Sequence, residues 1–175
     1  MKRTLANGLT AIALSLFLFS SVPAQDEARA AWQITNFDIT ANVQQNARAL
    51  SAVGVLSANN VGRGVGTSFT FRINAKASIK SVTVGGATAA VRAVAENYGN
   101  LQRITVTLPA SVPGGGSLVI TINYTLPVES NNGLAAISPG ESQFLPLSFW
   151  YPLPNTPFTV RGADTAPIYY RGLAG

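Results

Sequence analysis

Alternation of apolar and polar residues dominates the chain from Trp32 onward. Every second residue is apolar in residues 68–73, 104–108 and 118–126. A period of two is the pattern of a β-strand that buries one face and exposes the other. We therefore expect strands over these segments, with the last of them the longest.

Weaker strand signals and turn residues fill the intervals. Residues 34–39 alternate with a break near Asn36, residues 49–56 form a less regular candidate, and residues 79–84 run into Gly85-Gly86. Paired glycines favour a hairpin, which predicts a partner strand over 88–95. Turns are expected at 59–64, 96–100 and 109–116. No later segment keeps a helical period, so the prediction is an all-β domain, an antiparallel β-sandwich over 32–127.

The pattern changes after Pro127, where prolines become frequent and alternation fades. This C-terminal extension, residues 128–175, still carries large rings at Phe144, Phe149, Trp150 and Tyr151. Proline restricts the backbone, so such a segment can hold its shape without a ladder of hydrogen bonds. Two interpretations stay open: a rigid lid over one sheet, or a surface that docks a following domain. These four rings are the interface candidates of the second interpretation.

The N-terminus has the order of a signal peptide. Lys2 and Arg3 precede an apolar run from Leu9 to Phe19, and small residues lead to a predicted cleavage after Ala24. The apolar run is too short to cross a bilayer comfortably. We expect residues 1–24 to be removed, 25–31 to be a flexible lead-in, and the mature protein to be periplasmic or extracellular without a membrane anchor.

Composition excludes several kinds of chemistry. The sequence has no cysteine and no histidine, which removes thiolate sites, disulfides, the usual zinc ligands and the commonest general base. The net charge of +5 comes from arginines and lysines spread singly, which does not favour a nucleic-acid partner. Residues 62–66 are glycine-rich but lack the Lys-Ser/Thr pair of a phosphate loop. Glu129, Glu141 and Asp164 adjoin turn formers, so a carboxylate- or hydroxyl-based hydrolase is the least favoured function.

The order of these segments resembles a known family. Phe69-Thr70-Phe71-Arg72-Ile73-Asn74 is followed by Ile79 to Gly86, by Ile104 to Pro109, and by a glycine turn into the strand that ends at Tyr124. This arrangement is similar to the N-terminal β-sandwich (saddle-shaped) domain of the aminopeptidase N family, the gluzincin zinc metallopeptidases. Ser142-Gln143-Phe144-Leu145-Pro146 and Tyr151 to Pro157 further resemble two family segments, T-Q-F-E-P and F-P-C-F-D-E-P.

The resemblance implies a role for this stretch. In the family the glutamine lies on the substrate side, which makes Gln143 the candidate for substrate contact. The neighbouring family acid, which helps to hold a free amine, falls on Leu145, and the Cys and Asp of the second segment are absent. The zinc-binding catalytic domain would follow residue 175. Zinc is therefore expected only in that missing domain, and this chain is expected to hold no cofactor and to be no enzyme itself.

The favoured hypothesis is that the chain is a fragment of a longer exported protein. It would be the non-catalytic front domain of an aminopeptidase-N-like metallopeptidase, with the catalytic domain as its partner in cis and a peptide as a possible ligand. The alternative is a stand-alone exported β-sandwich that binds peptide, glycan or protein through Phe149, Trp150 and Tyr151.

Overall fold

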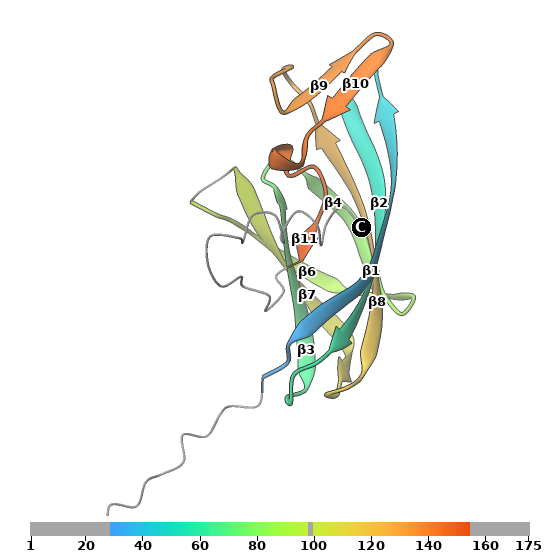
Figure 1. Ribbon diagram of the computed structural model, residues 1–175, viewed down its shortest axis with the longest axis vertical. Coiled ribbons are helices and arrows are strands. Elements are labelled where there is room, and N and C mark those ends of the chain that lie inside the picture. The colour runs from blue at the N-terminus through green and yellow to red at the C-terminus, as the bar shows by residue number, and fades with distance from the viewer. Residues whose placement is uncertain (1–28, 98–99, 155–175) are drawn as a thin grey trace, which may run out of the picture.

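The structure is a computed structural model that describes residues 29–97 and 100–154 (Figure 1). The predicted signal peptide, most of the lead-in and residues 155–175 lie outside the described residues. Within residues 29–97 and 100–154 the elements are eleven strands and one 3₁₀ turn. They are β1 (Trp32–Gln44), β2 (Ala49–Asn60), β3 (Gly66–Asn74), β4 (Ser78–Val84), β5 (Ala87–Thr88), β6 (Ala90–Ala95), β7 (Leu101–Val112), β8 (Ser117–Pro127), β9 (Ala135–Ser138), β10 (Glu141–Phe144), η1 (Pro146–Ser148) and β11 (Leu153–Pro154).

Two antiparallel sheets form the body of the domain, which confirms the predicted all-β sandwich. The first sheet has the order β1-β2-β8-β4-β5, and the second has the order β11-β3-β7-β6. A separate hairpin, β9–β10, extends beyond one end of the first sheet (Figure 1). In the described residues no helix is of a length and apolarity that would cross a membrane.

The core lies between the inner faces of the two sheets, and alternation decides which residues enter it. In β8 the even-numbered residues from Leu118 to Leu126 are buried, and their odd-numbered neighbours are not. Fully buried rings at Phe69 and Phe71 face them from β3, and Ile104 and Val106 do so from β7. Burying a side chain of this size contributes about 1.5–3 kcal/mol, so this face is the main source of stability.

The irregular strand 34–39 and the weak candidate 49–56 are both part of a long hairpin. β1 pairs with β2 over its whole length, and the register shifts between Ile34 and Asn36. This bulge explains the break in alternation that the sequence shows near Asn36. β2 continues four residues past the predicted end at Leu56, because β8 pairs with it as far as Asn59.

The prediction that a strand over 88–95 pairs with the strand over 79–84 is wrong. Gly85 and Gly86 do form the tight turn, with φ values of 57° and 87°, but only β5 returns along β4. The chain then crosses to the other sheet, where β6 pairs with β7. Val91 and Ala93 gain apolar partners there, since Val106 and Ile104 lie opposite them in the register.

The turn predicted at 109–116 is also shorter than expected. β7 runs through Pro109 and ends at Val112. Proline is tolerated at this point because β6 pairs with β7 only up to Thr107, and the pairing with β3 shifts register between Gly66 and Ser68. The turn itself is confined to residues 113–116.

The turn predicted at 59–64 begins later, because Asn60 is a buried structural residue. Its side chain is 0% exposed and fully hydrogen-bonded. Oδ1 accepts from the backbone N–H groups of Ala31 and Gly62, and Nδ2 donates to the carbonyl oxygens of Gly64 and Val112. One amide therefore joins the chain before β1, the loop after β2 and the end of β7.

Candidate functional site

The described part of the C-terminal extension, residues 128–154, folds over one end of the sandwich and borders a cleft. Val128 and Ile137 are buried at its base, 5% and 1% exposed. Between the extension and the sandwich is a cavity of about 190 Å³. Its lining is mixed polar and apolar, and it includes Asn74, Lys76, Glu129, Asn132, Leu134, Leu147 and Phe149.

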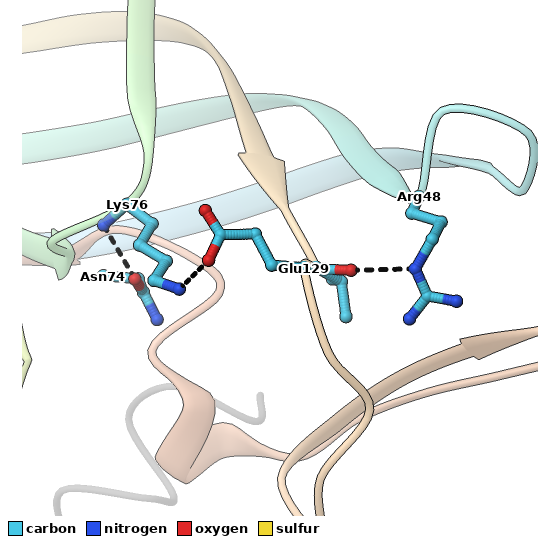
Figure 2. A network of polar contacts seen from close by, with 5 residues as sticks. Arg48, Asn74, Lys76 and Glu129 are labelled. Carbon is cyan, nitrogen blue, oxygen red and sulfur yellow. Dashed lines mark hydrogen bonds and ion pairs between the residues drawn. The ribbon is translucent and has the colours of Figure 1, made fainter.

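Arg48 attaches the extension to the sandwich from the turn between β1 and β2. Its Nε and Nη1 donate to the carbonyl oxygens of Val128 and Ile137, at 3.2 and 3.3 Å, and Nη2 donates to Asn131 Oδ1 at 2.7 Å. Its own carbonyl accepts from Val128 N at 2.7 Å. Figure 2 shows the contact between this guanidinium and the backbone beside Glu129.

Asn74 and Lys76 form the opposite wall of the cleft. Lys76 Nζ pairs with Glu129 Oε2 at 2.5 Å, and the Lys76 N–H donates to Asn74 Oδ1 (Figure 2). Asn74 also holds the end of η1, since its Nδ2 donates to Ser148 O and its backbone N–H donates to Phe149 O. The ion pair is mostly exposed, so it orients the two side chains more than it stabilises the fold.

Gln143, the substrate-contact candidate, lies on the hairpin outside the lining of the cleft. It is exposed on β10, opposite Ala136 of β9. Leu145 follows it, 40% exposed, and its backbone N–H donates to Leu134 O. Gln143 therefore belongs to the hairpin that extends beyond the first sheet (Figure 1), and Leu145 comes directly after the end of β10. The part that Gln143 plays in binding stays a prediction.

The four aromatic interface candidates pack largely against one another and the sandwich. Trp150 lies with its ring centroid 6.2 Å from that of Phe144 and 4.9 Å from that of Tyr151. Tyr151 also contacts Phe37 of β1 at 6.5 Å and is only 6% exposed. Phe149, which is half-buried with φ 52°, ends η1 and lines the cleft. Phe144 and Trp150 are half-buried as well, and whether these rings also serve as an interface stays a prediction.

The large exposed apolar side chains of this region are leucines, of which the sequence marks only Leu145, through the family resemblance. Leu134, Leu145 and Leu147 are 39%, 40% and 51% exposed. Leu134 and Leu147 both line the cleft, and the backbone N–H of Leu145 donates to Leu134 O; these three exposed leucines are here termed the leucine patch. Their separation in the sequence gives no period that could have marked them, because a hairpin and a 3₁₀ turn bring them together.

The arrangement supplies groups that can bind a ligand. Over 29–97 and 100–154, no three His, Cys, Asp or Glu residues gather as a metal-binding group. Burial raises the pKa of Tyr124, whose hydroxyl has no hydrogen-bond partner, so this phenol stays protonated. The cleft offers an ammonium group, a carboxylate and side-chain amides to a polar ligand, beside an apolar surface.

Comparison with known proteins finds matches among solved structures alone, since no family model and no curated protein matches. An M1 zinc metallopeptidase from Deinococcus radiodurans aligns with TM-score 0.44 and 17% identity, over 66% of this chain and 25% of its own. A point mutant of the same enzyme, bound to a Tyr-Ser-Ala substrate, aligns with TM-score 0.46 and 17% identity, over 68% and 28%. Leukotriene A4 hydrolase from Saccharomyces cerevisiae gives 0.47 and 12%, over 61% and 17%.

The Deinococcus radiodurans protein is a zinc metallopeptidase, the class that the sequence resembles. This chain spans between 17% and 28% of the length of these matched proteins. The likeness concerns the arrangement of the strands and transfers no activity to this chain.

Proposed function

We propose that this chain is the non-catalytic N-terminal domain of an exported aminopeptidase-N-like metallopeptidase. In the longer protein it would pack against the catalytic domain, which holds the zinc, and form one wall of the substrate cleft. The observation that carries this proposal is the leucine patch. Leu134, Leu145 and Leu147 are exposed together on a segment that hydrogen bonds hold in place.

An exposed apolar surface of this kind is typical of an interface. The patch is built on rigid elements, since Arg48 binds the base of the hairpin and Asn74 binds the end of η1. A docking domain would therefore lose little conformational entropy on the side of this chain. Gln143, exposed on the same hairpin, would lie at the rim, where a peptide substrate could accept or donate a hydrogen bond.

The first experiment reads the DNA and transcript beyond the codon for Gly175. An open frame that continues into a segment with His-Glu-x-x-His supports the proposal. The encoded catalytic domain is then produced separately, and its binding to this chain is measured by calorimetry. Because truncating a buried interface leucine typically costs about 1 kcal/mol or more, Leu145→Ser with Leu147→Ser should weaken binding by about tenfold or more.

The matched control changes two equally exposed valines in the loop after β2. Val61 and Val65 are 54% and 57% exposed, and Val61→Ser with Val65→Ser should leave the affinity unchanged. Equal effects of the two double variants would contradict docking through the leucine patch. Release of amino acids from peptides by this chain alone with added zinc would overturn the non-catalytic role.

A stand-alone exported module that binds peptide, glycan or protein is the second candidate. The extension favours it, because Tyr151 and Leu153 complete the core without any further domain, at 6% and 3% exposed. A transcript that ends after Gly175, together with a monodisperse and protease-resistant chain, would select this function. Aggregation that Leu145→Ser and Leu147→Ser relieve would select the docking domain instead.

A further inference from the structure

The strand β6 (Ala90–Ala95) is an open edge of the second sheet. It pairs with β7 on one side, and among the described residues no strand lies on its other side (Figure 1). All its residues are exposed, and its sequence, Ala-Val-Arg-Ala-Val-Ala, contains no proline and shows no register shift against β7. Proline and bulges protect many edge strands, because free N–H and C=O groups pair with other extended chains; of the usual protections β6 has one charged residue, Arg92.

The outer face beside this edge carries two arginines over a shallow concavity of about 300 Å³. Arg92 of β6 lies opposite Thr105 of β7, which in turn lies opposite Thr70 of β3. Two residues further along each strand, Arg103 of β7 lies opposite Val94 of β6. Guanidinium and hydroxyl donors thus line one shallow hollow that three neighbouring strands hold in place.

The charge of these two arginines is not neutralised by an ion pair within the described chain. Glu96, the acid that follows β6, accepts from Arg72 Nε at 2.7 Å through its Oε2. That hydrogen bond is the main cause of the lowered pKa of Glu96, and the charges of Arg72 and Arg103 add to it. Neither Arg92 nor Arg103 forms a hydrogen bond or an ion pair through its guanidinium with a described residue. The hollow is therefore a site for an anionic group.

The inner face of the same strand is apolar and uncovered. Val91 lies opposite Val106 in the register and so points to the core side, yet it is 43% exposed. Ala93, opposite the buried Ile104, is exposed as well. The free edge thus presents a cationic outer side and an aliphatic inner side to whatever pairs with it.

We propose that β6 receives an extended segment of a partner protein by antiparallel or parallel strand addition. The segment would carry acidic residues toward Arg92 and Arg103, alternating with aliphatic residues that cover Val91. A second copy of this chain is disfavoured as the occupant, because its own β6 would bring another Arg92 to the same sheet. No aromatic ring lines the hollow, which disfavours a sugar or a nucleobase that would need stacking.

The test uses the full chain and two labelled peptides as long as β6. One alternates glutamate and valine, and the other has the same composition with the glutamates in one block. Fluorescence anisotropy at low salt should show saturable binding of the alternating peptide, at least about fivefold tighter than of the block peptide, because only alternation places every acid on the cationic side. Amide exchange of Ala90–Ala95 should slow when the alternating peptide binds, because strand addition pairs these groups.

Variants distinguish binding of the peptide at β6 from nonspecific electrostatic attraction of an acidic peptide to a basic protein. Arg92→Gln with Arg103→Gln should weaken binding about tenfold, the effect of two exposed ion pairs at low salt, whereas Arg63→Gln in the loop after β2 should not. Arg92→Glu with Arg103→Glu should prefer a peptide that alternates lysine and valine, a gain that misfolding cannot produce. Equal affinity for both glutamate peptides, or binding without protection of Ala90–Ala95, would overturn the proposal.

Discussion

Substitution of Arg48 tests whether the guanidinium of this residue attaches the extension to the sandwich. The residue has a left-handed backbone, with φ 47°, in the turn between β1 and β2. Its guanidinium bonds the backbone at Val128 and Ile137 and the side chain of Asn131. Asn131 Oδ1 also accepts from the Ile137 N–H at 3.0 Å, so the two links are coupled. Arg48→Ala removes the guanidinium contacts and leaves the bond from Val128 N to the Arg48 carbonyl.

The magnitude follows from the geometry of these bonds. A hydrogen bond with a charged donor contributes about 1.5–3 kcal/mol when it is buried. Arg48 is half-buried and two of its contacts are 3.2 and 3.3 Å long, so each contributes less. We expect Arg48→Ala to lower the free energy of opening the β9–β10 hairpin by about 2 kcal/mol, which corresponds to roughly thirtyfold faster amide exchange.

The backbone conformation provides a second variant. Glycine adopts a positive φ without the penalty of about 1 kcal/mol that a side chain incurs. Arg48→Gly should therefore loosen the hairpin as much as Arg48→Ala does, while lowering global stability by about 1 kcal/mol less. Thermal or urea unfolding compares the global values.

Hydrogen exchange followed by mass spectrometry measures the local effect. Segments covering 131–145 should exchange faster in Arg48→Ala, and segments of β7 (Leu101–Val112) should not change. Arg63→Ala is the matched control, because Arg63 is exposed and its guanidinium forms none of the hydrogen bonds to residues 128–137 that Arg48 forms. If exchange over 131–145 were the same in both variants, the guanidinium would not be what fixes the extension.

Three further changes test the core and its charges. Asn60→Ala should cost about 3–5 kcal/mol, because the groups that bond its buried amide lose their partners, and a loss below about 1 kcal/mol in urea unfolding would contradict this. Tyr124→Phe should leave stability unchanged or raise it by up to about 1 kcal/mol, because its buried hydroxyl has no partner, and a clear drop in Tm would show that the hydroxyl is bonded. Glu96→Gln should destabilise by about 0.5–1 kcal/mol near pH 7. Since Arg72 lowers the pKa of Glu96 below its ordinary 4.5, this difference should be present above pH 4.5 and vanish as the pH falls through the lowered value, and a difference that persists at pH 2 would contradict the ion pair.

Part of the candidate site could be located from the sequence, because its residue types are unusual. The proline- and aromatic-rich composition after Pro127 correctly marks a segment that packs on the sandwich. The contacts that each aromatic ring makes could not be predicted from this composition. Phe144, Trp150 and Tyr151 meet through contacts between a strand and a loop, so neither period two nor period 3.6 applies to them. The leucine patch is missed for the same reason.

The polar residues that organise the fold are also hidden in the sequence. Asn60 and Arg48 occur among turn formers, where exposed polar side chains are ordinary. Only the approach of chain segments far apart in sequence makes Asn60 a buried centre, since it joins Ala31 to Val112. Arg48 likewise reaches Ile137, 89 positions away.

The amino-acid sequence by itself determined the all-β class, the inner and outer face of most strands, and the chemistry that the chain cannot perform. These follow from local alternation and from which side chains exist at all. The tertiary structure alone decided that β6 leaves the Gly85-Gly86 hairpin for the other sheet, that the extension returns to pair with β3, and that Arg92 and Arg103 share one hollow. Those outcomes depend on which apolar faces pack against each other across long loops. The free energy of this long-range packing cannot be predicted from the sequence of any single segment.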